Sequence, residues 1–219
     1  MKPDSEIKRD VDDELRWDPN VHADDIVIAV TDGVVALTGF VPSYAGKSAA
    51  EKAAQRVAGV VGVADDLEVR PPGIDQPPDP DIARDAVREL KAWVPGCWEN
   101  IKAVVNNGLV TLDGEVEWNY QRENAEMGIN CITGVTGVNN LISLKPKPAP
   151  ASGKIKQQIE EAFRRSALID ANRITVEADG GEVTLEGTVR SWAERQEAER
   201  AAWSGPGVFK VDNRIVVSP

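Results

Sequence analysis

A chain of 219 residues with 36 acidic and 25 basic side chains carries a formal net charge of −11 at pH 7. This balance argues against a dedicated nucleic-acid-binding protein, because such proteins gain most of their affinity by neutralising phosphates with lysine and arginine. No run of 18 consecutive apolar residues is present, so the sequence predicts no transmembrane segment.

One short motif occurs three times along the chain. It reads DGVVALTG at 32–39, NGLVTLDG at 107–114 and GGEVTLEG at 180–187, at offsets of 75 and then 73 residues. The similarity extends on both sides of the motif. The sequence therefore predicts three copies of one structural unit.

Each repeat begins with an amphipathic helix. In the first repeat Ile7, Val11 and Leu15 recur every four residues, which places them on one stripe of a helix. Equivalent stripes follow in the other two repeats: Ile82, Ala86 and Leu90, then Ile155, Ile159 and Phe163. A residue with N-cap preference precedes each stripe: Asp4, Asp79 and Ser152.

Two strands joined by a tight turn follow this helix. Apolar residues alternate with period two at 26–30, 101–105 and 174–178, directly before the motif. Asp-Gly and Asn-Gly favour the positive φ angles of a type I′ hairpin turn. The motif thus predicts the tip and second strand of a β-hairpin. Its turn glycines are Gly33, Gly108 and Gly181.

A second helix and a third strand complete each repeat. The helices are predicted at 45–60, 121–135 and 193–208, and small residues dominate one face of each. Three glycines are expected to end them at left-handed caps: Gly59, Gly134 and Gly207. In each strand that follows, one polar residue occupies a position that faces inward, like the valines of the strand. An inward polar side chain must find hydrogen bonds, and we expect a local bulge or a neighbouring loop to supply them. These residues are Asp65, Asn140 and Asn213.

These elements predict an α+β protein of three tandem α-β-β-α-β modules. Each module has a three-stranded mixed sheet with both helices on one face, because the third strand returns over a helical crossover and should run parallel to its neighbour. Proline-rich segments of the kind that act as semi-rigid spacers separate the repeats. The predicted modules span residues 1–72, 73–147 and 148–219.

The repeat resembles the BON domain, a family named for bacterial osmotically inducible and nodulation proteins. The resemblance rests on the DGVVALTG-type hairpin, the alanine-rich helix and the closing GVVGVADDLEV, GVTGVNNLISL and GVFKVDNRIVV, in which Gly59, Gly134 and Gly207 occupy the characteristic glycine. It implies a non-catalytic module, proposed to bind phospholipid and to protect the envelope during osmotic stress. Many family members are periplasmic or attached to outer-membrane proteins, and cytoplasmic examples occur.

No catalytic or metal-binding pattern is found in the sequence. His22 is the single histidine, and GxxxxGK[ST], HExxH and GxSxG motifs are missing. The sequence therefore predicts a protein that is not an enzyme and that holds no cofactor. Cys97 and Cys131 are either two reduced thiols packed as small hydrophobes or a single bridge within the middle repeat.

Aromatic and basic residues near the second helices are the candidate lipid or partner contacts. Amphipathic rings suit a membrane interface or a partner site, although they can also cover the end of a small core. Residues 149–219 carry a net charge of −1, against −6 for 1–73 and −4 for 74–148, so the third repeat is the one least repelled by anionic lipid. Interleaved glutamates leave open the alternative of an exposed, ion-paired helix. The candidates are Trp118, Tyr120, Arg190, Trp192, Arg195, Arg200 and Trp203.

The uncovered face of the sheet is a second candidate surface. In the first two repeats it presents several apolar residues, whereas in the third it presents mostly threonine and glutamate. We expect the first two faces to be buried against each other or against a partner. Their apolar residues are Val27, Val34, Val104, Leu109 and Leu141.

Two classes of function follow from these observations. The first is a bacterial stress or osmoprotection protein that contacts phospholipid surfaces, as the resemblance implies. The alternative is a cytoplasmic protein-binding or chaperone-like scaffold, with a small-ligand or ion sensor less favoured. The N-terminal MKPDSEIKRDVDDELRW lacks the apolar core of a secretory signal, which predicts a cytoplasmic location, or a periplasmic one if a leader has been removed.

Overall fold

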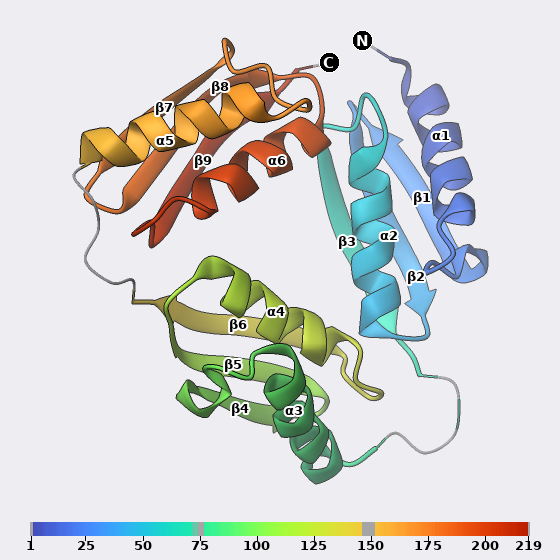
Figure 1. Cartoon of the computed structure of the whole chain (residues 1–219). Coiled ribbons are helices and arrows are strands. Elements are labelled where there is room, and N and C mark those ends of the chain that lie inside the picture. Colours follow the sequence, from blue (N-terminus) through green and yellow to red (C-terminus); the bar gives the residue numbers. More distant parts are fainter. Residues whose placement is uncertain (1, 72, 74–76, 146–151, 219) are drawn as a thin grey trace. The chain divides into compact units, whose positions relative to one another are not determined.

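The computed structural model describes residues 2–71, 73, 77–145 and 152–218 (Figure 1). Three separate sheets, with strand orders β1-β2-β3, β4-β5-β6 and β7-β8-β9, form three modules with the same succession of main elements. The predicted α-β-β-α-β unit and α+β class are confirmed. The predicted module boundary at 147/148 and residue 72 lie outside the described residues.

The elements of each module follow one pattern of lengths. The first module contains α1 (Asp4–Trp17), a 3₁₀ turn η1 (Ala23–Asp25), β1 (Ile26–Thr31), β2 (Val34–Val41), α2 (Tyr44–Arg56) and β3 (Gly62–Val69). The second contains α3 (Asp79–Trp93), η2 (Trp98–Asn100), β4 (Ile101–Asn106), β5 (Leu109–Val116), α4 (Asn119–Asn130) and β6 (Gly137–Leu144). The third contains α5 (Ser152–Arg165), β7 (Ile174–Asp179), β8 (Glu182–Val189), α6 (Trp192–Trp203) and β9 (Lys210–Val217).

Each sheet has the predicted mixed topology. β1 pairs antiparallel with β2 and β2 pairs parallel with β3, and the same two pairings join β7, β8 and β9. Figure 1 shows α1 with α2, and α5 with α6, on one face of their respective sheets. Alternate strand residues therefore point either into a helix-covered core or onto an open face.

The core of each module lies between the helices and the sheet. In the first module the stripe of α1 is at most 1% exposed, and the small residues of α2 are fully buried against the same cluster. Alanine at these positions lets the second helix lie close to the strands. The corresponding residues of the three second helices are Ala50, Ala53, Ala54, Ala125, Ile129, Ala198, Ala201 and Ala202.

The hairpin turns have the backbone geometry that Asp-Gly and Asn-Gly predict. Asp32 and Gly33 have φ angles of 52° and 77°, and Asn107 and Gly108 have 50° and 77°. Positive φ at both central residues is the signature of a type I′ turn. In the third module only the first glycine of the turn, Gly180, has a positive φ, of 58°.

The aspartates expected to cap the first helices have a different role, which corrects the N-cap prediction. Asp4 and Asp79 are the first helical residues, and the caps are the prolines before them. The carboxylate of Asp79 accepts hydrogen bonds from the backbone N–H groups of Asn107, at 2.9 Å, and Gly108, at 3.0 Å. Asp4 holds the first hairpin in the same way. The first helix is therefore bound to the tip of the hairpin.

We expect Asp79→Ala to destabilise the second module by about 1–2 kcal/mol, because two charge-assisted hydrogen bonds are lost. Urea unfolding measures the loss, and amide exchange at Asn107 and Gly108 locates it. Asp81→Ala is the matched control, since Asp81 is the other acidic residue in the first turn of α3. Equal effects of the two substitutions would show that the loss of stability comes from the interaction of the charge with the helix dipole, and not from the two hydrogen bonds to the hairpin.

The glycines after the second helices do not cap them, which corrects a second prediction. α2, α4 and α6 end several residues earlier, at Arg56, Asn130 and Trp203. Gly59, Gly134 and Gly207, with φ of 97°, 90° and 81°, are the third residues of turns closed by N–H to C=O bonds of 3.2–3.3 Å. Positive φ at this position is typical of a type II turn, which requires glycine.

Candidate functional site

The two candidate tryptophans of the third module lie at the two ends of α6, and both are half-buried. Trp203 packs against the buried core of its module. The ring of Trp192 lies beside the guanidinium of Arg195, whose carbon is 5.0 Å from the ring centre. Trp203 therefore covers part of the core, and Trp192 forms a cation–π pair at the surface.

Arg195 is bound to the outer edge of β9. Its Nε donates to the carbonyl of Ile215, at 3.0 Å, and a terminal nitrogen donates to the carbonyl of Asn213, also at 3.0 Å. These carbonyls belong to an edge strand, because β9 pairs only with β8 among the described residues. Arg195 thus satisfies backbone groups that would otherwise face solvent or another chain.

The polar residue of the third strand belongs to the same edge in every module. Asp65, Asn140 and Asn213 each accept, through the side-chain oxygen, the N–H two residues further along the strand, at 3.0–3.2 Å. The side chains of Asn140 and Asn213 also donate to glutamates of the second helix, Glu126 and Glu199. The prediction that these residues find hydrogen bonds is confirmed, but the partners belong to the strand itself and to the second helix instead of a bulge or a neighbouring loop. These bonds occupy groups at the outer edge of the strand.

In the first module a lysine binds the outer edge of the third strand, as Arg195 does in the third module. Lys47, which stands where the third repeat has Arg195, donates to the carbonyl of Leu67 at 2.6 Å and lies 3.6 Å from the carboxylate of Asp65. A lysine suits an aspartate at this place because the two charges are opposite. Aligning the repeats by residue type would have revealed this pairing of helix and strand from the sequence.

The remaining basic candidates of α6 differ in their surroundings. Arg200 forms a two-point contact with the carboxylate of Glu197, at 2.6 and 2.7 Å, which holds the pKa of Glu197 below its usual range. Arg190 has an exposed side chain, and its backbone N–H donates to the buried carboxylate of Glu194 at 3.0 Å. Ser191 is the N-cap of α6, and its hydroxyl oxygen accepts the N–H of Glu194 at 3.2 Å.

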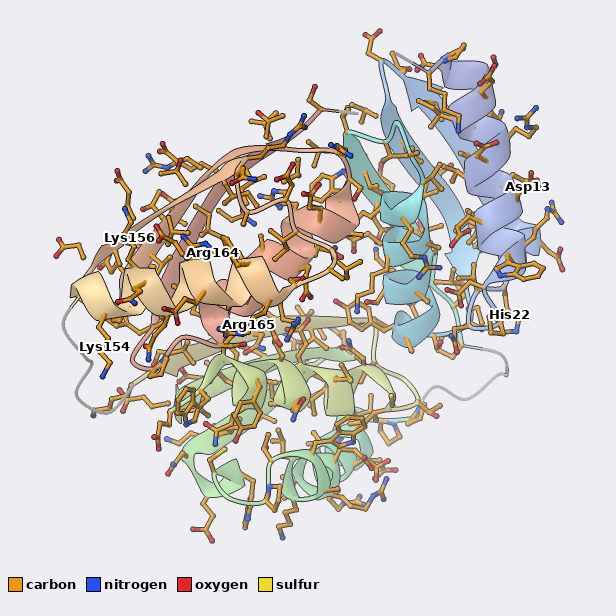
Figure 2. The ribbon with its side chains drawn as sticks, turned by 45° about the horizontal axis from the view of Figure 1, so that its top comes forward. Asp13, His22, Lys154, Lys156, Arg164 and Arg165 are labelled. Carbon is orange, nitrogen blue, oxygen red and sulfur yellow. The ribbon has the colours of Figure 1, made fainter. Side chains whose placement is uncertain are left out.

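A second basic surface lies on α5, and the candidate residues did not include it. Lys154, Lys156, Arg164 and Arg165 are all exposed and project from the helix (Figure 2). Two acidic residues, Glu160 and Glu161, share this helix. Glu160 lies 3.9 Å from both Lys156 and Arg164. α5 therefore has an excess of two positive charges.

The equivalent helices of the other modules carry the opposite charge. α1 has six acidic and three basic residues, and α3 has four acidic and three basic residues. Comparing charge helix by helix, instead of repeat by repeat, would have found the basic surface of α5 from the sequence. The net charge of the third repeat hides it because β7 and β8 together carry four acidic residues and no basic one.

The aromatic candidates of the second module differ in exposure. Trp118 is half-buried just before α4, and Tyr120, in the first turn of that helix, is 58% exposed. Tyr120 therefore offers an amphipathic ring to solvent or to a partner.

The open sheet faces of the first two modules expose the apolar side chains that the sequence singled out. Each of them is between 43% and 64% exposed: Val27, Val34, Val104, Leu109 and Leu141. Their burial against each other or against a partner stays a prediction.

The two cysteines are separate thiols. Cys97 is buried, and this burial raises the pKa of its thiol. Cys131 is exposed, with its sulfur 3.5 Å from the carbonyl oxygen of Met127. Over residues 2–71, 73, 77–145 and 152–218, no three His, Cys, Asp or Glu side chains form a group that could hold a metal ion.

The helices of the modules are short and amphipathic. Within the part of the chain that the structure describes, none of them has the length and apolar character needed to cross a membrane.

Comparisons with known proteins give a family and one curated relative. The BON domain pattern matches three segments of this chain, at residues 3–71, 79–146 and 152–219. Osmotically-inducible protein Y of Escherichia coli (strain K12) is 33% identical over 150 residues, which cover 65% of this chain and 73% of the relative.

Comparison with solved structures gave matches of low structural similarity. The C-terminal domain of CdsD, the structural protein of the type III secretion system of Chlamydia trachomatis, is 14% identical, with 100% of both chains covered and a TM-score of 0.28. The PrgH periplasmic domain is 11% identical, with 94% of this chain and 99% of that domain covered and a TM-score of 0.22. At these TM-scores neither structure carries an argument about this protein.

Proposed function

This chain belongs to the BON domain family, and from that premise we propose that it is a non-catalytic protein of the osmotic stress response that contacts anionic phospholipid surfaces through its third module. The stress role is supported by the similarity to osmotically-inducible protein Y. The phospholipid contact is supported by the distribution of charge over the three modules.

The observation that carries this proposal is the basic surface of α5. Four exposed basic side chains stand on one helix of a chain whose net charge is −11. Each lysine or arginine close to an anionic leaflet contributes about 1 kcal/mol, and the contribution falls off within a Debye length. The acidic remainder of the chain is repelled by the same leaflet. The protein therefore approaches an anionic bilayer with α5 toward the lipid.

Residues near the start of α6 extend this surface. α6 covers the same sheet face as α5 (Figure 1), and Arg190 and Trp192 stand at its N-terminal end. An indole ring next to cationic groups suits the boundary between headgroups and acyl chains. Arg195 and Arg200 act mainly by keeping this helix and its strand in place, through the bonds to β9 and to Glu197.

The test is co-sedimentation of the full chain with vesicles of phosphatidylcholine, with and without phosphatidylglycerol, at low and at physiological salt. We expect binding that requires the anionic lipid and that weakens as salt is added. Lys154→Glu with Arg165→Glu should lower the apparent affinity at least about tenfold, because two attractive charges become repulsive.

The matched control is Arg84→Glu with Arg88→Glu on α3, which changes the net charge by the same amount in another module. Equal loss of binding in the two double variants would mean that net charge alone matters. A folded chain that sediments with neither vesicle would overturn the proposal.

A protein-binding or chaperone-like scaffold is the second candidate function. It is supported by the open sheet faces of the first two modules, which expose large apolar side chains where a sheet in contact with water usually has polar ones. Val104→Lys with Leu141→Lys should abolish suppression of aggregation of a client protein and leave vesicle binding unchanged. Retained suppression in this variant would argue against the scaffold.

A further inference from the structure

The two outer edges of the first sheet differ. On β3, Asp65 and Lys47 occupy the edge N–H and C=O of Leu67. On the other side, β1 pairs only with β2 among the described residues. Thr31 and Val34 are paired next to the two-residue turn, so Ile28 and Val30 direct their N–H and C=O groups toward the free edge.

β1 also lacks the side chains that usually protect a free edge. Its six residues, IVIAVT, contain no charge and no proline. The strands at the same place in the other modules are charged: β4 has Lys102 where β1 has Val27, and β7 has Glu177 where β1 has Ala29. Charges of this kind prevent edge-to-edge pairing. β1 is therefore the edge most open to another strand.

The helix above this edge carries a self-complementary pair of charges. Glu14 of α1 contacts Arg56 of α2 at 2.9 Å, so this side of α1 faces α2. Lys8 and Asp12 are four residues apart and lie on the opposite flank of α1, where Asp12 also accepts a hydrogen bond from Arg16 of the same helix at 3.0 Å. If two such helices run antiparallel, Lys8 of each lies opposite Asp12 of the other.

We propose that the chain forms a two-fold homodimer in which β1 pairs antiparallel with β1 of a second copy. The two sheets become one sheet of six strands, and each α1 lies beside its counterpart on the helix-covered face. Backbone bonds from Ile28 and Val30 hold the strands together, Val27 and Ala29 meet across the new pair on the open face, and Lys8 pairs with Asp12 on the helical face. A second copy fits this edge because both its strand and its flanking charges are complementary to themselves. The contact is separate from the basic surface of α5.

The first test is sedimentation equilibrium of the full chain over a range of concentrations. Val27→Lys places on β1 the residue that β4 carries naturally, at a side chain that is 64% exposed, so the fold is retained. We expect this substitution to raise the dimer dissociation constant at least about tenfold. Val104→Lys, at a side chain that is 63% exposed in the second module, is the matched control and should leave the constant unchanged.

A charge exchange tests the geometry. Lys8→Asp places an acid opposite Asp12 of the second copy and should weaken the dimer, whereas Lys8→Asp with Asp12→Lys restores opposite charges and should recover the affinity. Melting temperatures of all variants check that each remains folded. A chain that stays monomeric up to about 1 mM, equal effects of Val27→Lys and Val104→Lys, or no recovery in the double variant would overturn the proposal.

Discussion

Replacing Gly114 with alanine is expected to unfold the second module under conditions in which the rest of the chain stays folded. Gly114 has a φ of 147°, and a Cβ there would lie 2.1 Å from the carbonyl oxygen of Asn100 and 3.0 Å from its carbon. Both atoms are backbone, so no side-chain rotation relieves the clash. The strain and the forced separation of β4 from β5 should cost at least about 3 kcal/mol.

The loss should appear as a fall of at least about 12 °C in the melting temperature of this module. Amide exchange followed by mass spectrometry assigns the unfolding to residues 101–116. Gly96→Ala is the matched control in the same module, because a Cβ there meets no atom within 4 Å. Similar melting temperatures of the two variants would contradict the prediction. The same clash is present at Gly39 and Gly187, where a Cβ would lie 2.0 Å from a backbone oxygen.

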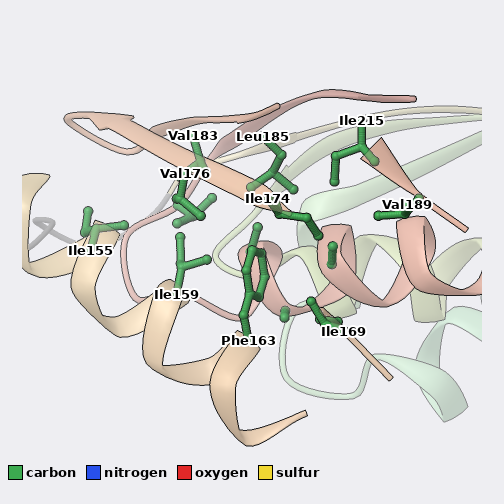
Figure 3. Packing of buried hydrophobic residues seen from close by; sticks show 14 residues of the cluster. Ile155, Ile159, Phe163, Ile169, Ile174, Val176, Val183, Leu185, Val189 and Ile215 are labelled. Atoms are coloured by element: carbon green, nitrogen blue, oxygen red, sulfur yellow. The ribbon is translucent and has the colours of Figure 1, made fainter. Parts of the chain in front are cut away.

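Truncating Phe163 should produce the largest loss of stability in the third module. The side chain is 1% exposed, and Figure 3 shows its ring pointing from α5 into the core, with Ile169 and Ile174 nearby. Phe163→Ala removes a whole ring and leaves a cavity in a small core. We expect a loss of about 3–5 kcal/mol in the free energy of unfolding.

The repeats supply a control for this prediction. Leu15 and Leu90 occupy the same position in the first two modules, where they are also buried. Phe163→Leu should therefore cost less than about 1.5 kcal/mol, because a residue of similar volume refills the site. Urea unfolding of the two variants gives both values. If Phe163→Leu lowers the free energy of unfolding as much as Phe163→Ala does, the specific shape of the ring, and not the volume that it fills, stabilises the core.

The helices and strands could be predicted from the sequence because the patterns that indicate them are local and occur three times. Apolar residues four apart identified α1, α3 and α5, and alternation on either side of Asp-Gly or Asn-Gly identified the hairpins. Hydrogen bonds made across the module were not predictable in the same way. Asp79 has the residue type and position of an N-cap, yet its acceptor oxygens bind amides 28 and 29 residues away.

The candidate surfaces also combine features that the sequence shows with contacts that only the fold reveals. Arg195 is a charged residue on a surface helix, and the sequence could not distinguish a lipid contact from a bond to a strand edge 18 to 20 residues away. The basic surface of α5 was present in the sequence, but the acidic residues of β7 and β8 in the same repeat concealed it in the net charge. Only the fold shows that the helices and the strands occupy different faces.

The three modules, their α-β-β-α-β order and the alternation of inward and outward residues in their strands could be predicted from the sequence, because periodicity and turn chemistry depend on neighbouring residues. Which polar groups meet depends on how the elements pack in space. The tertiary structure assigned Asp4 and Asp79 to the hairpin tips and Asp65, Asn140 and Asn213 to the strand edges. It also set Gly39, Gly114 and Gly187 against a backbone carbonyl. These contacts join segments distant in the chain, and their distances depend on how helix and sheet pack together.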